Sequence, residues 1–243
     1  MPTIRNRHIR KPGQLGAPYT ADDGLGLWDG CDYKVINCTI DMSDAEDCDE
    51  AVAITYGASA TFTNCIIRGA GKLALCGSGD SSVANKENGK HVLFDHCILE
   101  NCGRRAPEVQ AGMEVILDHC LIRNWADPGF FSVRGFGAWA HHGGRILARN
   151  CVFWQDSFHF SFKDMFNHVG QAVNDRGLLQ IFNLKNYRPG CCRALTAGVD
   201  GCVEAVNCYA SKWWLSIEGM DDKMGKDEAS DLIISLEAKC GCK

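Results

Sequence analysis

The sequence predicts an all-β protein whose strands wind into a parallel β-helix. Three observations lead to this fold: a phrase centred on cysteine recurs along the chain, short apolar strands flank its copies, and no helical periodicity lies between them. With 243 residues, of which 46% are hydrophobic, the chain is long enough for one sizeable core. We expect a single β-helix domain over residues 1–243, with coils at about 3–210 and a segment at about 211–243 that packs on the helix or caps it.

The repeated phrase places Asn or His before Cys and short apolar residues after it. Its copies are Asn37-Cys38, Asn64-Cys65, His96-Cys97, His119-Cys120 and Asn150-Cys151, with a weaker copy at Asn207-Cys208. Irregular intervals in the twenties and thirties are typical of a solenoid. Because Asn tolerates left-handed backbone, we expect a tight bend at this position. The Cys that follows then points inward as a small, reduced, buried hydrophobe.

Strands are expected where β-branched and aromatic residues dominate short apolar runs. Since such strands recur once per turn without hairpin signals, they should stack in parallel, giving roughly seven or eight coils. The expected strands are Leu25–Trp28, Val52–Thr55, Ala60–Ile67, Leu73–Cys76, His91–Leu99, Glu114–Ile122, Phe131–Val133 and Arg145–Phe153.

Charge and hydropathy exclude two classes of partner. The net charge of −5 gives no basic excess, so we expect no nucleic-acid partner. No apolar run is long enough to span a bilayer, so we expect no membrane association. The first ten residues, MPTIRNRHIR, do not read as a signal peptide because no apolar stretch follows them.

Three segments carry chemically informative side chains on successive coils. The acidic run Asp41–Glu50 is either a solvated loop or a source of carboxylate oxygens for Ca²⁺, with Asp22 and Asp23 one coil earlier. Lys72 begins a strand, and Arg104-Arg105 precede Ala-Pro in a rigid cationic turn. Carboxylates, Lys and Arg on one face suit an acidic sugar polymer, whose uronate could be neutralised to favour β-elimination.

The segment Glu100–Gly112, ENCGRRAPEVQAG, resembles the ENxxxRxPxxRxG motif of the pectate lyases of polysaccharide lyase family 1. Thr3–Gly13, Asp23–Ile40, Ala51–Ile67 and Lys72–Ser82 resemble further family segments in the same order, so the likeness covers roughly residues 3–155. The resemblance implies a right-handed parallel β-helix. It also implies a lyase that cleaves a galacturonate-type polymer, such as pectate or pectin, by Ca²⁺-assisted β-elimination.

The resemblance implies roles for individual residues. Arg105 takes the place of the proposed proton-abstracting arginine, and Lys72 that of a lysine that binds the substrate carboxylate. Asp23 and Asp49 take the places of two calcium ligands, with Asp22 and Asp47 as further candidates for the metal. Gln110, Arg104 and Arg134 are the candidates for substrate binding, although Gln110 replaces a family arginine.

Departures from the family pattern keep other functions open. Ala53 stands where the family has a calcium-binding aspartate, so a non-catalytic β-helix that binds acidic saccharide is an alternative. A structural or adhesive rod is another. The chain starts at a strand that follows several coils and a cap in the family, so the N-terminal coil could form an oligomer contact. The resemblance implies secretion, whereas many reduced cysteines favour a reducing compartment.

Two aromatic pairs have simpler explanations. His141-His142 look like a metal pair, but adjacent residues on a strand point to opposite faces, so we expect a loop pair. Trp213-Trp214 are either a sugar-binding platform or, as we expect, part of the packing of the C-terminal segment on the helix.

Overall fold

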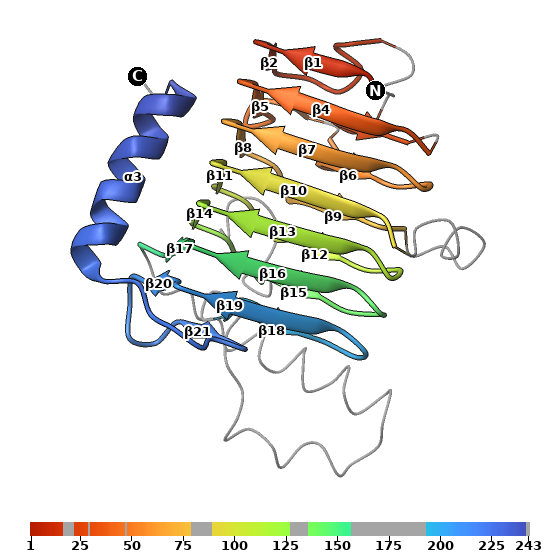
Figure 1. Ribbon diagram of the computed structural model, residues 1–243. Helices are drawn as coiled ribbons and strands as arrows, with labels where there is room; N and C mark the ends of the chain where they lie inside the picture. Colours follow the sequence, from red (N-terminus) through yellow and green to blue (C-terminus); the bar gives the residue numbers. More distant parts are fainter. Residues whose placement is uncertain are drawn as a thin grey trace.

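The chain winds through three parallel sheets that stack their strands along one axis (Figure 1). The computed structural model describes residues 1–16, 22–28, 30–46, 48–78, 89–126, 136–156 and 193–241. Within them, each sheet has seven strands, and its neighbouring strands are parallel and come from successive coils. The predicted all-β parallel β-helix is therefore confirmed. The predicted strand Phe131–Val133 lies outside the described residues.

Each coil contributes one strand to each sheet. Sheet A contains β1 (Thr3–Arg5), β4 (Asp32–Ile36), β7 (Ser59–Thr63), β10 (His91–Asp95), β13 (Glu114–Asp118), β16 (Arg145–Arg149) and β19 (Cys202–Val206). Sheet B contains β2 (His8–Ile9), β5 (Thr39–Asp41), β8 (Ile66–Arg68), β11 (Ile98–Glu100), β14 (Leu121–Arg123), β17 (Val152–Trp154) and β20 (Tyr209–Ala210). Sheet C contains β3 (Leu25–Leu27), β6 (Glu50–Ile54), β9 (Lys72–Cys76), β12 (Glu108–Val109), β15 (Ala138–Ala140), β18 (Arg193–Ala197) and β21 (Ser216–Ile217).

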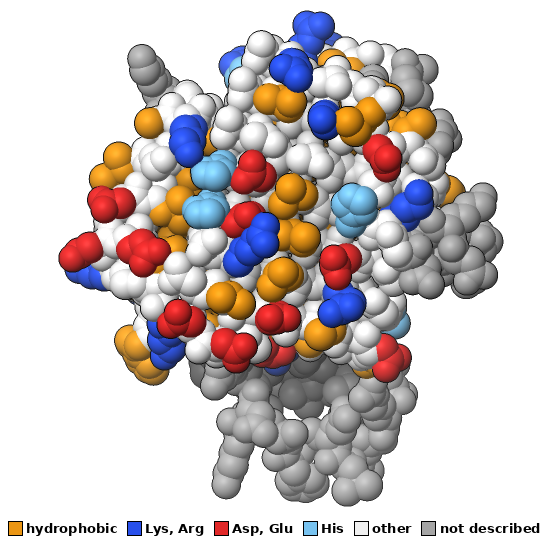
Figure 2. Space-filling model, in the orientation of Figure 1, with side chains coloured by type: hydrophobic (Ala, Val, Ile, Leu, Met, Phe, Trp, Pro, Cys, Tyr) orange, Lys and Arg blue, Asp and Glu red, His pale blue; other side chains and the backbone are white. Residues whose placement is uncertain are grey.

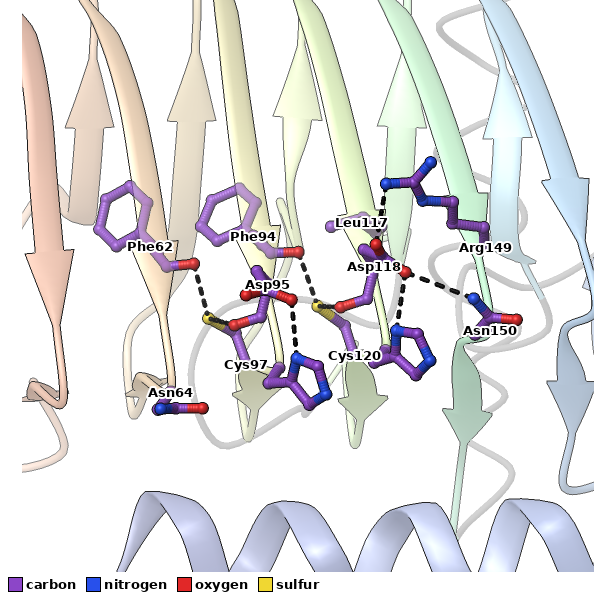
Figure 3. A network of polar contacts seen from close by, with 12 residues as sticks. Phe62, Asn64, Phe94, Asp95, Cys97, Leu117, Asp118, Cys120, Arg149 and Asn150 are labelled. Atoms are coloured by element: carbon purple, nitrogen blue, oxygen red, sulfur yellow. Dashed lines mark hydrogen bonds and ion pairs between the residues drawn. The ribbon is translucent and has the colours of Figure 1, made fainter.

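The corner between sheets A and B is built by the repeated Asn/His-Cys phrase. Asn64 has a φ of 53° and His96 a φ of 52°, which confirms the predicted left-handed bend. The thiol of Cys97 points inward and donates to the carbonyl of Phe62 on the preceding coil at 3.5 Å (Figure 3). Outside the core, the amide of Asn64 donates to Asn37 at 3.3 Å. Successive coils therefore register through a thiol inside and, where the phrase begins with Asn, through an amide outside.

The core consists of apolar side chains that stack continuously from coil to coil between the three sheets. Phe62 and Phe94, fully buried on adjacent coils, stack with ring centroids 4.9 Å apart. The six cysteines of the repeat are buried free thiols, as expected: Cys38, Cys65, Cys97, Cys120, Cys151 and Cys208. On the outer face of sheet A, acidic, basic and apolar side chains are interspersed (Figure 2).

A helix, α3 (Lys226–Cys240), lies along the outer face of sheet B (Figure 1). Its Ala229 and Leu236 bury against Ile66, Ile98 and Leu121 of that sheet. It ends at Gly241, whose φ of 76° is left-handed and whose N–H caps the carbonyl of Glu237. Among the described residues, no helix has the length and hydrophobicity needed to cross a membrane.

Candidate functional site

The outer face of sheet C brings the predicted cationic residues together. Glu50 of β6 and Lys72 of β9 are register partners, and Lys72 forms a parallel bridge with Arg104 on the next coil. The backbone holds this row, because Ala74 donates to the carbonyl of Arg105 at 2.7 Å. Residues from three separate segments of sequence therefore lie side by side across three coils.

Arg105 is clamped between two buried carboxylates. Its Nη1 pairs with Oε1 of Glu50, and its Nε lies 2.8 Å from Oε2 of Glu108. Both glutamates are at most 5% exposed. The backbone of Arg105 is left-handed, with a φ of 65°. A guanidinium remains protonated in proteins, and two acidic partners stabilise that charge. The arrangement therefore presents Arg105 as a fixed cation.

Lys72 pairs with Asp49, a carboxylate that is more exposed than the two glutamates beside Arg105. Its ammonium pairs with Oδ1 of Asp49 and lies 3.7 Å from Oε1 of Glu50. The hydrogen bond from Lys72 lowers the pKa of Asp49 and outweighs its partial burial. The side chain of Asp49 is 55% exposed, so a substrate carboxylate could replace it on Lys72 at modest cost.

The pKa values of the two buried glutamates shift in opposite directions. Burial raises the pKa of Glu50 to about 7, although the charges of Arg105 and Lys72 oppose the shift. Burial also acts to raise the pKa of Glu108, but the hydrogen bond with His141 and the charge of Arg105 bring it below its ordinary value. Glu108 is therefore the carboxylate that stays ionised at neutral pH.

The described acidic residues do not fit a calcium site. Burial raises the pKa of Asp23, and its Oδ1 accepts the N–H of Glu50 at 3.1 Å. Asp22 is exposed, and Asp49 is occupied by Lys72. Within the described ranges no group of three or more His, Cys, Asp or Glu residues is arranged to hold a metal. Asp47 lies outside these ranges, so its part in the predicted Ca²⁺ site is not tested.

The remaining predicted substrate residues lie in different surroundings. Gln110 is buried, and its amide donates to the carbonyl of Gly77 at 3.2 Å, so it joins two coils. Gly77 is required there because a Cβ would lie 2.3 Å from the carbonyl oxygen of Gln110. Burial, together with the charge of Arg105, lowers the pKa of Arg104, which is half-buried. Arg134 lies outside the described residues.

Three residues at this face were not expected to belong to the site: Glu108, His141 and His142. His141 follows β15, and its Nε2 lies 3.1 Å from Oε1 of Glu108. Its ring stacks on Trp139 at 4.0 Å and contacts His142. The two histidines do lie in a turn, as expected, but the turn is next to the site. Glu108 stands inside the Arg-Pro motif, and that position was the available sequence signal.

Comparison with known proteins assigns the chain to a family. Residues 23–155 match the family model described as right handed beta helix region. The chain belongs to the right-handed β-helix family. No curated protein sequence matches it.

Two solved structures share the fold at low sequence identity. The thermostable pectate lyase PL 47 has a TM-score of 0.57 at 13% identity, covering 89% of this chain and 53% of the lyase. A pectate lyase bound to a hexasaccharide has a TM-score of 0.56 at 12% identity, with coverages of 96% and 60%. The chain thus spans little more than half the length of these lyases. The expected pectate lyase-like β-helix is confirmed as a fold.

Proposed function

We propose that this protein is a polysaccharide lyase that cleaves an acidic, galacturonate-type polymer such as pectate by β-elimination. The observation that carries the proposal is the row on sheet C, where Lys72, Arg104 and Arg105 come together on adjacent coils. The fold supports it, since the two solved structures described above are pectate lyases and one of them is bound to a hexasaccharide. A secreted protein would meet such a polymer.

The first step of the proposed chemistry is the neutralisation of the uronate carboxylate by cationic side chains. Lys72 binds the uronate carboxylate in place of Asp49, and Arg104 adds a second cation beside it. Arg105, held by Glu50 and Glu108, stabilises the negative charge that develops on the carboxylate when the C5 proton leaves. Fixed charges aimed at developing charge are typically a large part of such catalysis. The proposed mechanism includes no step that uses calcium, because the described residues do not form a site that fits the ion.

The proposal is tested by following the ultraviolet absorbance of unsaturated uronate on polygalacturonate and on methylated pectin. Wild type should release unsaturated uronate. Arg105→Ala should lower kcat by about 10²–10³-fold, the usual cost of removing one charge-stabilising donor. Arg5→Ala, an exposed arginine on sheet A, is the matched control and should behave as wild type. A folded wild-type protein that releases no unsaturated product from either polymer would refute the proposal.

A non-catalytic saccharide-binding β-helix is the second candidate. It is favoured by the pairing of Lys72 and Arg105 with Asp49, Glu50 and Glu108, which leaves the face with charges that largely cancel. In that case galacturonate oligosaccharides should bind without being cleaved. Calorimetric titration with Lys72→Ala as the comparison would measure that binding separately from turnover.

A further inference from the structure

A small cavity lies where α3 runs along the outer face of sheet B (Figure 1). Its volume is about 330 Å³, at the lower end of the range that is typical of small-molecule sites. Leu121 of β14 and Ile233 of α3 supply its apolar lining, and polar side chains from the ends of β11, β14 and β17 supply the rest. The cavity therefore has room for one small ring.

Trp154, which lines the cavity, ends a row of side chains across sheet B. Glu100, Arg123 and Trp154 are register partners on successive strands. Arg123, the cation beside the cavity, pairs through Nε with Oε2 of Glu100. Its Nη1 lies 3.0 Å from Oε1 of Glu237 on α3. The charge of Arg123 is therefore already balanced by two carboxylates of the protein.

The carboxylate of Asp156 is held at the exposed side of the cavity by two neutral donors. Nε1 of Trp154 donates to its Oδ1 at 2.8 Å, and Nδ2 of Asn124 donates to its Oδ2 at 3.0 Å. The hydrogen bond from Trp154 lowers the pKa of Asp156 and outweighs the effect of partial burial. Since an ionised carboxylate can accept about four hydrogen bonds, Asp156 still offers lone pairs to a ligand.

A hydrogen-bond donor lies beside this acceptor. Asn124 donates through Nδ2 to Oδ1 of Asn101 at 3.3 Å, and its own Oδ1 accepts the N–H of Asp156 at 3.2 Å. These contacts fix both amides. Among the described residues, no hydrogen bond uses the amide nitrogen of Asn101, which carries two N–H donors. The cavity therefore presents a planar donor next to a planar acceptor.

We propose that this cavity binds the ring of one neutral sugar unit. Each sugar hydroxyl can both donate and accept, so two adjacent hydroxyls match the carboxylate of Asp156 and the amide of Asn101. The apolar C–H face of the ring would pack on the indole of Trp154 and on the apolar lining. These residues have no part in the proposed elimination, and the inference does not depend on the lyase function.

The charges favour a neutral ligand over a charged one. A uronate would find Arg123 already paired and would be repelled by the ionised Asp156. An ammonium ion would be attracted by Asp156 and by an indole face, but it has no lone pair to accept the N–H groups of Asn101. A hydroxyl group satisfies both partners, and this is why a neutral sugar is the occupant we propose.

The test follows the indole N–H signals by two-dimensional proton–nitrogen NMR while neutral methyl glycosides are added: the glucoside, galactoside, mannoside and xyloside. The chain has 6 Trp residues, and Trp154→Phe identifies the signal of Trp154. That signal should shift along a saturating curve with a Kd on the order of 1 mM for at least one glycoside. Trp213, whose side chain is 94% exposed, is the internal control and should not shift.

A second variant tests the polar contacts. Asp156→Asn removes the charged acceptor from an exposed position and should weaken the binding of the glycoside by about 10–100-fold, the usual effect of losing a hydrogen bond to a charged group. Asp32→Asn, an exposed acid of sheet A, is the matched control and should keep the wild-type Kd. The remaining signals of each spectrum report whether the variant is folded.

The outcomes decide between the possible occupants. A saturable shift of the Trp154 signal that is lost in Asp156→Asn supports a neutral sugar. No saturable shift with any glycoside overturns the proposal, and so does an equal shift of the Trp213 signal, which would mean unspecific contact with exposed indoles. A response to tetramethylammonium alone would make the cavity an ammonium site. Galacturonate that binds there as tightly as the neutral glycosides would overturn the argument from charge.

Discussion

At the scale of single residues, the site is a row in which each acid lies next to a cation. Glu50 lies between Lys72 and Arg105, and Glu108 lies between Arg105 and His141. Sharing partners in this way fixes the orientation of Arg105 more firmly than one exposed ion pair could. Burial makes the ionisation of Glu50 costly, although the charges of Arg105 and Lys72 favour it.

The first prediction concerns this ionisation. The folded-state pKa of Glu50 is raised from 4.5 to about 7, so between these pH values the folded protein keeps a proton that the unfolded chain releases. The free energy of unfolding should therefore fall as pH rises through this window, by up to about 3 kcal/mol. Glu50→Gln cannot ionise and should flatten the curve.

Urea unfolding at pH values between 4.5 and 7 measures this slope. Glu46→Gln, an exposed acid of the neighbouring loop, is the control and should follow wild type. A Glu50→Gln curve that is as steep as the wild-type curve would contradict the assignment.

The second prediction concerns the bend at Asn64, where φ is 53°. Asn64→Ala should destabilise the fold by about 1–2 kcal/mol, because a left-handed backbone is strained for alanine. Asn64→Gly loses the same amide bond to Asn37 but accepts this backbone, so it should cost less. Equal losses in the two variants would mean that the amide ladder, and not the backbone, stabilises the corner.

At the scale of elements, the bends and strands are predictable from short stretches of sequence, whereas the side-chain contacts between coils are not. The bends could be predicted because Asn or His and Cys occur together in every copy, and the strands because each is a short apolar run. Glu108 and His141 could not be paired from the sequence, because their contact depends on which residues of adjacent coils come into register on sheet C. The intervening loops vary in length, so that register is not set by a fixed period.

The third prediction tests how α3 is attached. Leu236 is fully buried against sheet B, whereas Ile234 on the same helix is 65% exposed. Leu236→Ala should lower the free energy of unfolding by about 2–5 kcal/mol, and Ile234→Ala should change it by less than about 0.5 kcal/mol. Chemical unfolding of both variants measures the difference, and similar values would mean that α3 does not pack on the sheet as described.

At the scale of the whole molecule, the β-helix is a ladder in which each coil contacts mainly its two neighbours. Stability is then roughly a sum over coils and their interfaces, and the sheet C face can carry polar residues without interrupting the core. The likeness to pectate lyases was predictable from the Arg-Pro motif. The ion pair between Lys72 and Asp49 was not predictable, because a sequence motif does not specify which side chains pair with each other.

The fourth prediction concerns calcium. A metal that binds only the folded state raises the melting temperature, by an amount that grows with its concentration. Since the described carboxylates form no metal group, millimolar Ca²⁺ and chelator should give the same melting temperature and the same elimination rate. A higher melting temperature in Ca²⁺ that disappears in Asp23→Asn would instead support the ligands implied by the family resemblance.

The most direct test of the central claim is the mass of the products formed from a defined galacturonate hexasaccharide. Elimination adds no water, so the masses of two complementary fragments should sum to that of the substrate, with the double bond on one fragment. Hydrolysis would add one water to that sum and would contradict the lyase. An intact hexasaccharide that binds to the protein would contradict it too, and would leave a saccharide-binding β-helix.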